Sequence, residues 1–136
     1  MTTATLVDSN VLIDVFGGDG PWTSRSATAL EAAANAGPLV INQVIYAEIA
    51  VRYEDTDELD GDLPRDVFQR ESVPWSAAFL AGKAFEIYRG RGGVRRSPLP
   101  DFFIGAHAAV TGLRLLTRDA SRYRSYFPTV ELIAPE

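Results

Sequence analysis

The sequence contains no cysteine and only one histidine, His107. Without cysteine the chain forms no disulfide bond and no thiolate metal site, and a single histidine leaves no second imidazole for a zinc site or an acid–base pair. No run approaches the about 18 apolar residues of a membrane-spanning helix, and the opening MTTATLVDSN lacks the basic segment and long apolar run of a signal peptide. We therefore expect a cytoplasmic protein with no membrane segment, in which His107 is structural.

An excess of positive charge is also lacking, because the formal net charge is −5. This value argues against a generally basic nucleic-acid binder, yet the basic residues are clustered. One cluster runs from Arg89 to Arg96 and a second from Arg114 to Arg124, and every basic residue except Lys83 is an arginine. Arginine suits bidentate contacts with phosphate, although a GC-rich coding sequence would give the same bias.

The order of the predicted elements favours an α/β fold. The chain of 136 residues has the size of one domain, and we expect residues 1–136 to form a single domain. Short apolar runs that alternate with helical patterns predict a central, mainly parallel sheet of about four to five short strands between two layers of helices. The predicted strands are 4–7, 39–41, 113–117 and 129–133. The predicted helices are 11–16, 22–36, 43–53, 63–70, 76–88 and 101–112, with a helical turn at 120–123. A polar loop is predicted at 54–61, and a connector or edge strand at 73–75.

Two carboxylates flank a predicted helix and strand in the last third of the chain. Asp101 follows Pro100, which suits the first helical position, and Gly112 supplies a left-handed stop before the strand. The helix from Asp101 to Gly112 would run about 18 Å, and the strand that leads to Asp119 returns roughly 16 to 20 Å. If the two pack side by side, Asp101 and Asp119 lie at the same edge of the fold.

Two further acids are predicted at that edge. Asp8 directly follows the first predicted strand, and Ser9 and Asn10 are predicted caps of the helix that comes next. Glu48 has apolar neighbours at helical spacing and should point inward, which is costly for a carboxylate unless a cation compensates it. Because the carboxyl ends of parallel strands share one edge, Asp8, Glu48, Asp101 and Asp119 can converge.

Converging carboxylates restrict the chemistry. They repel one another in a partly dry cleft, so they are tolerated only with bound cations or raised pKa values. Oxygen ligands without cysteine or histidine select Mg²⁺ or Mn²⁺, and we expect one or two such ions. An open magnesium site suits phosphate esters. Taken singly, each acid also has an ordinary structural explanation as a turn residue, a helix-terminal charge or a cap, and Asp14 is expected to be such a solvent-facing or capping acid.

Several segments resemble a known family, the PIN domain, and specifically VapC toxins of type II toxin–antitoxin pairs. The resemblance covers almost the whole chain. It implies a Mg²⁺-dependent endoribonuclease that usually cuts tRNA or ribosomal RNA, is neutralised by a cognate VapB-type antitoxin, and is generally a homodimer. The segments that carry it are LVDSNVLIDVF, VIYAEIAV, PLPDFFIGAHAAVTGLRLLTRD and VELIAPE.

The resemblance also implies roles for individual residues. Asp8, Glu48, Asp101 and Asp119 match the metal-binding quartet of the family; in the hypothesis that follows, the three aspartates ligate Mg²⁺, Glu48 binds through water or orients the attacking water, and the product carries a 5′-phosphate. The matching accessory polar positions are Asn10 and Thr117, and the position three after Asp119, acidic in some relatives, is Arg122. The candidate RNA-contacting residues are Arg89, Arg91, Arg95, Arg96, Arg118 and Arg122, and a solvated loop is the alternative for the first four.

Two other functions fit parts of the pattern. A phosphatase of the haloacid-dehalogenase type would need a second aspartate where Asn10 stands. A PIN-like module that binds metal or RNA without cleaving is the second alternative. Incubation with RNA separates this module from a nuclease, because a binder shifts RNA without shortening it.

Overall fold

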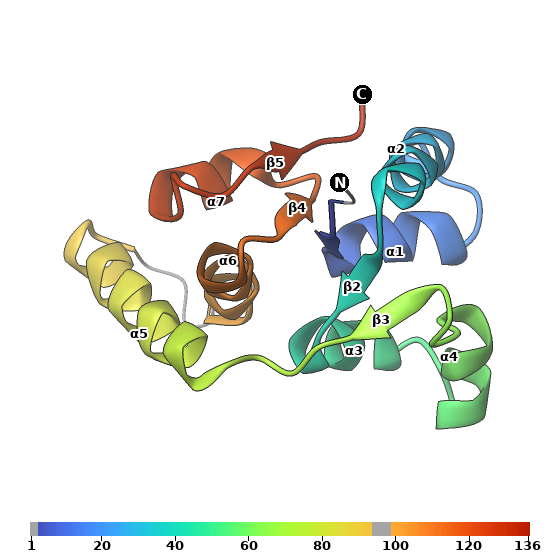
Figure 1. Ribbon diagram of the computed structural model, residues 1–136, viewed down its shortest axis with the longest axis horizontal. Coiled ribbons are helices and arrows are strands. Elements are labelled where there is room, and N and C mark those ends of the chain that lie inside the picture. Colours follow the sequence, from blue (N-terminus) through green and yellow to red (C-terminus); the bar gives the residue numbers. More distant parts are fainter. Residues whose placement is uncertain (1–2, 94–98) are drawn as a thin grey trace.

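The computed structural model describes residues 3–93 and 99–136, and in this part of the chain five strands form one sheet (Figure 1). Every neighbouring pair is parallel, in the order β3-β2-β1-β4-β5. The prediction of an α/β fold with a central parallel sheet is therefore confirmed. The strands are β1 (Thr5–Val7), β2 (Leu39–Ile41), β3 (Phe68–Arg70), β4 (Arg114–Leu116) and β5 (Leu132–Ile133).

Helices cover both faces of this sheet. In Figure 1, α5, α6 and α7 lie on one side of the strands, and α1 and α2 lie on the other. None of the helices within residues 3–93 and 99–136 is long and apolar enough to cross a membrane. The helices are α1 (Ser9–Phe16), α2 (Thr23–Ala36), α3 (Gln43–Ala50), α4 (Thr56–Asp62), α5 (Trp75–Gly90), α6 (Leu99–Thr111) and α7 (Ala120–Tyr126).

The central strands are short and fully buried, as expected of a parallel sheet that is covered on both faces. Every residue of β1 and of β2 is buried. The chain leaves each of these strands through a polar residue that caps the following helix: Asp8 accepts from the Ser9 backbone N–H at 2.7 Å, and Asn42 accepts from the Ile45 N–H at 3.0 Å. The predicted cap at Asn42 is confirmed, whereas Asp8 rather than Ser9 or Asn10 is the cap of α1.

Two segments between β2 and α5 differ from the predictions. The polar segment 54–61 is largely helical, because Asp55 caps α4 by accepting from the Glu58 N–H at 2.9 Å and Leu59 is buried beneath it. The segment 63–70 is not a helix but ends in β3, an edge strand that pairs with β2. Phe68 turns into the core while its neighbours in β3 stay exposed, so one buried aromatic at a sheet edge outweighs the local helical pattern.

Several predicted boundaries move by a few residues. Helix α5 begins at Trp75 after Pro74, without a side-chain cap from Ser76. Helix α6 begins at Leu99, and Gly112 adopts the predicted left-handed conformation with φ +69°. The last strand is reduced to two residues. These shifts do not change which residues follow the carboxyl ends of the strands. We call this side of the sheet the carboxyl edge.

Candidate active site

The pairing of β1 with β4 brings Asp8 beside Thr117. In the parallel register Val7 lies opposite Leu116, and the Asp8 N–H donates to the Leu116 carbonyl at 2.9 Å. The Thr117 hydroxyl then donates to Asp8 Oδ2 at 2.7 Å. Asn10 extends the network, because its Nδ2 lies 3.3 Å from Asp119 Oδ2. Asp8 and Asp119 are thus joined through two short polar side chains.

Glu48 reaches this edge from α3. The Ser9 hydroxyl donates to Glu48 Oε1 at 3.0 Å and lies 3.4 Å from Asp8 Oδ1, so it bridges the two carboxylates. Partial burial raises the pKa of Glu48, and the negative charges of Asp8 and Asp101 add to this effect, whereas the hydrogen bond from Ser9 opposes it. The inward orientation expected from the apolar stripe of α3 therefore leaves Glu48 half-buried beside other acids.

Asp101 lies in the first turn of α6 and contacts two residues of α7. The Tyr123 hydroxyl is 3.1 Å from Asp8 Oδ2 and 3.5 Å from Asp101 Oδ1, and Arg122 forms an ion pair with Asp101. Tyr123 is 1% exposed, and burial together with the charges of Asp8 and Asp101 raises its pKa well above the ordinary value of 10.0. Tyr123 therefore remains protonated, and its single O–H donates to Asp8 or is shared with Asp101.

Sequence reasoning missed Tyr123 and the contact from Ser9 to Glu48. Tyr123 comes four residues after Asp119, one turn into α7. An aromatic residue at that spacing gives a weak signal, because it could equally pack into the core without contacting an acid. The hydroxyl of Ser9 gives no sequence signal beyond its place next to Asp8.

Asp8 is a deeply buried acid whose charged form is disfavoured. It is 3% exposed, and its pKa is raised from 3.8 to about 6, chiefly because burial removes water from the charged form. The charge of Asp101 raises this pKa further, while hydrogen bonds from Thr117, Tyr123 and the Ser9 N–H lower it. No cationic side chain of residues 3–93 and 99–136 forms an ion pair with Asp8, so a cation placed here would be stabilised.

The donor chemistry of this edge fits a hard divalent cation. All candidate ligands are carboxylate, hydroxyl or amide oxygens, which are the donors that Mg²⁺ and Mn²⁺ prefer. The structure brings Asp8, Glu48 and Asp101 within mutual electrostatic reach. In the part of the chain that the structure describes, however, no three acidic or histidine side chains surround a single point at metal-binding distance.

The second arginine cluster is mostly engaged with acids. Arg118 Nε lies 2.7 Å from Asp14 Oδ2, and its guanidinium is 5.2 Å from the Trp22 ring centroid. The side chain of Asp14 is only 10% exposed and also accepts from Ser26, so the expectation of a solvent-facing acid is wrong. Arg118 therefore stabilises the contact of α1 with the loop after β4.

The structure describes only two of the four arginines of the first cluster. Arg89 and Arg91 are exposed at the end of α5, where their guanidinium groups lie 5.9 Å from the Phe85 ring and 5.2 Å from the Tyr126 ring. Arg95 and Arg96 lie outside the described residues.

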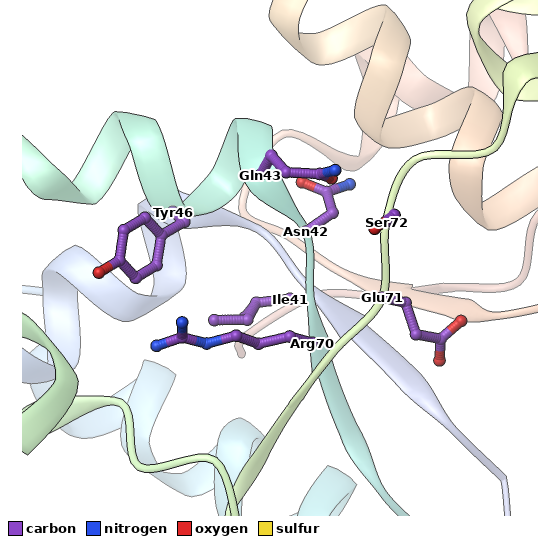
Figure 2. Close-up of a pocket in the computed structure, with 7 residues that line it drawn as sticks. All are labelled: Ile41, Asn42, Gln43, Tyr46, Arg70, Glu71 and Ser72. Carbon is purple, nitrogen blue, oxygen red and sulfur yellow. The ribbon is translucent and has the colours of Figure 1, made fainter.

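His107 and a neighbouring pocket belong to the scaffold. His107 is fully buried, with Nδ1 3.0 Å from Asn42 Nδ2, and burial lowers its pKa. A cavity of about 280 Å³ opens nearby at the ends of β2 and β3, and none of the four acids lines it. Figure 2 shows Tyr46 and Arg70 pointing to one side of this cavity and Glu71 to the other. Tyr46 and Arg70 both bind Asp60, at 2.9 and 2.6 Å, so these two polar groups of the lining are already engaged.

Several solved structures of known proteins have a fold similar to that of this chain. A structure of VapBC2 from Rickettsia felis bound to a promoter DNA fragment is similar, with 14% identity, a TM-score of 0.73, and 98% of this chain and 100% of that chain covered. A toxin–antitoxin complex from Klebsiella pneumoniae has 24% identity, a TM-score of 0.67 and coverage of 97% and 98%. VapBC-1 from nontypeable Haemophilus influenzae has 14% identity, a TM-score of 0.72 and coverage of 97% and 98%.

A search of curated proteins finds no match. The sequence profile of the PIN domain, in contrast, matches residues 5–127, from the first residue of β1 to Phe127, which caps the C-terminal end of α7. That span contains all four acids of the carboxyl edge and the whole parallel sheet except β5. The chain therefore belongs to the PIN domain family.

Proposed function

We propose that this protein is a Mg²⁺-dependent endoribonuclease toxin of the VapC type, which hydrolyses phosphodiester bonds in tRNA or ribosomal RNA. The observation that carries the proposal is Asp8, a buried acid with a pKa raised to about 6, beside Asp101 and Glu48 and without an ion pair among the described residues. A buried carboxylate in such surroundings is costly unless a cation joins it. Membership of the PIN domain family supports a nuclease as the function that this arrangement serves.

In this proposal Asp8, Asp101 and Asp119 hold Mg²⁺, and Mn²⁺ can substitute for it. When bound, the ion activates water and neutralises the charge that develops on the phosphate. Glu48 acts through water, either as an indirect ligand or by orienting the attacking water, and Ser9 fixes the Glu48 carboxylate by donating to it at 3.0 Å.

The accessory residues orient the ligands. Thr117 donates to Asp8 Oδ2, and its oxygen accepts from the Asp119 backbone N–H at 3.0 Å. Asn10 holds the Asp119 carboxylate through Nδ2, while its Oδ1 accepts from the Arg118 N–H at 3.3 Å. These contacts limit the rotation of two ligands before any cation arrives, which reduces the entropic cost of binding it.

We also propose two protein partners, a VapB-type antitoxin and a second copy of the chain. The protein would act on its RNA substrate in the cytoplasm. The similar structures are VapBC complexes, which supports the antitoxin. On α5, Trp75 is 92% exposed and Phe79 is 70% exposed, and Val44 and Phe103 line the same shallow apolar depression as Trp75. Apolar side chains gathered on one face favour burial against another chain, and we assign this face to the second copy.

One observation favours a second candidate, a PIN-like module that binds metal or RNA without cleaving. Asp101 is paired with Arg122, and among the described residues no three acids surround one point. A protein fixed in this arrangement would bind a cation weakly and would not cleave.

Incubation of the purified protein with total RNA tests the proposal. We expect fragments with Mg²⁺, none with excess EDTA, and none from Asp119→Asn, which loses one proposed ligand. Asp66→Asn is the matched control, because Asp66 is exposed and lies outside the site. RNA that is retarded on a gel but keeps its length with Mg²⁺ would support the binding module instead.

A further inference from the structure

Arg122 places a positive charge inside the acidic edge. The residue lies on α7 and forms an ion pair with Asp101 on α6, and the side chains are 33% and 22% exposed. Asp119 is close enough to act electrostatically on the same guanidinium. Arg122 therefore compensates two of the four acids, while Asp8 and Glu48 have no ion pair within the described residues.

Protein donors already contact both oxygens of Asp101. Arg122 binds Oδ2, and the Tyr123 hydroxyl lies 3.5 Å from Oδ1. A divalent cation that binds Asp101 would have to share a carboxylate with a guanidinium, and two cations at that distance repel each other strongly in a partly buried site. Cation binding and the Arg122–Asp101 pair therefore compete for the same carboxylate.

We infer that Arg122 is a competitor built into the chain: its guanidinium occupies the cation position at Asp101, and a divalent ion gains this ligand only when Arg122 leaves. The inference rests on the proposed metal-dependent function. It also offers a reason why no three acids converge among the described residues, since both oxygens of Asp101 are contacted by residues of α7.

The other arginines near the site do not have this role. Arg118 is held by Asp14 and by the ring of Trp22. Arg124 lies on the same short helix as Arg122 but is exposed. The side chain of Arg122 is one-third exposed and forms a single ion pair among the described residues, so it can leave Asp101 for solvent without breaking a second one.

The test measures Mn²⁺ binding to the whole chain by electron paramagnetic resonance, which needs no activity. Arg122→Gln removes the competitor, and we expect about tenfold tighter binding, equivalent to about 1.4 kcal/mol. Arg124→Gln removes the same charge from the exposed side of α7 and should change the affinity by less than about twofold, because exposed charges are screened. Arg122→Lys keeps a cation at the position and should bind Mn²⁺ close to the wild-type level.

A second measurement uses the unaltered protein, so that it does not depend on whether a variant folds. The Nη1–H signal of Arg122, which belongs to the group that contacts Asp101, should move from an ion-paired to a solvated position in the ¹⁵N NMR spectrum as Mg²⁺ is added. An unmoved signal at saturating Mg²⁺ overturns the inference. Equal affinities of Arg122→Gln and Arg124→Gln, or weaker binding by Arg122→Gln, overturn it as well but leave the proposed function in place, since the wild type still binds Mn²⁺. If neither the wild type nor Arg122→Gln binds Mn²⁺, the proposed function fails, and the inference fails with it.

Discussion

Replacement of Asp8 by asparagine should stabilise the metal-free protein at neutral pH. Asp8 is 3% exposed, and burial with the nearby charge of Asp101 raises its pKa from 3.8 to about 6. The raised value means that the folded state holds the charged form less well than the unfolded state does. Asparagine has nearly the same shape, keeps an oxygen that can accept from Thr117 or from the Ser9 N–H, and carries no charge.

The sign and size of the effect follow from this pKa. Because the folded-state pKa lies above the unfolded value, the contribution of Asp8 to stability is complete below 3.8 and is lost as the pH rises through about 6. One pKa unit corresponds to about 1.36 kcal/mol, so the raised pKa of Asp8 lowers the stability at neutral pH by about 3 kcal/mol. Asparagine accepts fewer hydrogen bonds than a carboxylate, at about 0.5–1.5 kcal/mol for each bond lost. We therefore expect a net gain of about 1–2 kcal/mol at neutral pH.

Urea denaturation in excess EDTA measures this gain. Asp8→Asn should have the higher free energy of unfolding at neutral pH, and its advantage should shrink as the pH falls through about 6 toward 4. Asp66→Asn removes the same charge from an exposed position and should show neither effect. An Asp8→Asn protein that is less stable than the wild type at neutral pH, or whose advantage does not change with pH, would refute the reasoning.

Three further predictions concern packing, assembly and metal. Gly105→Ala should lower the free energy of unfolding by about 1–3 kcal/mol in urea denaturation, because the new methyl group would collide with the ring of Phe127; an unchanged value would show that the ring moves aside at no cost. Trp75→Glu, alone or with Phe79→Ser, should convert the proposed homodimer to a folded monomer in sedimentation velocity, since both side chains are exposed in the single chain, whereas a persistent dimer would place the interface elsewhere. Mg²⁺ at about 100 times its dissociation constant should raise the stability of the wild type by about 2.7 kcal/mol, and calorimetry of Asp119→Asn should show a smaller rise; equal rises would exclude Asp119 as a ligand.

Much of the carboxyl edge could be predicted because it depends on local signals. Asp8 and Asp119 follow strands, and parallel strands carry such residues to one edge. Glu48 was predicted from the apolar neighbours on its helix. These inferences need only the order of the elements and the helical period, and short sequence patterns predict both.

The remaining contacts depend on how distant elements dock. Tyr123 reaches Asp8 across 115 positions of sequence, and Arg122 reaches Asp101 only because α7 packs beside the start of α6. Short-range patterns contain no information about such docking, and for the same reason the edge strand at Phe68 was predicted as a helix. Asp14 was misjudged in the same way, since its partner Arg118 is brought to it by the pairing of β1 with β4.

The chemistry of the cut RNA ends tests the central claim most directly, namely that these carboxylates hold a metal ion that activates water against a phosphodiester bond. After incubation of RNA with the wild-type protein and Mg²⁺, we expect fragments whose 5′ ends carry a phosphate and can be ligated without prior phosphorylation. Fragments that end in a 2′,3′-cyclic phosphate would contradict the account, because the 2′-hydroxyl would then be the nucleophile and the four acids would have no water to activate.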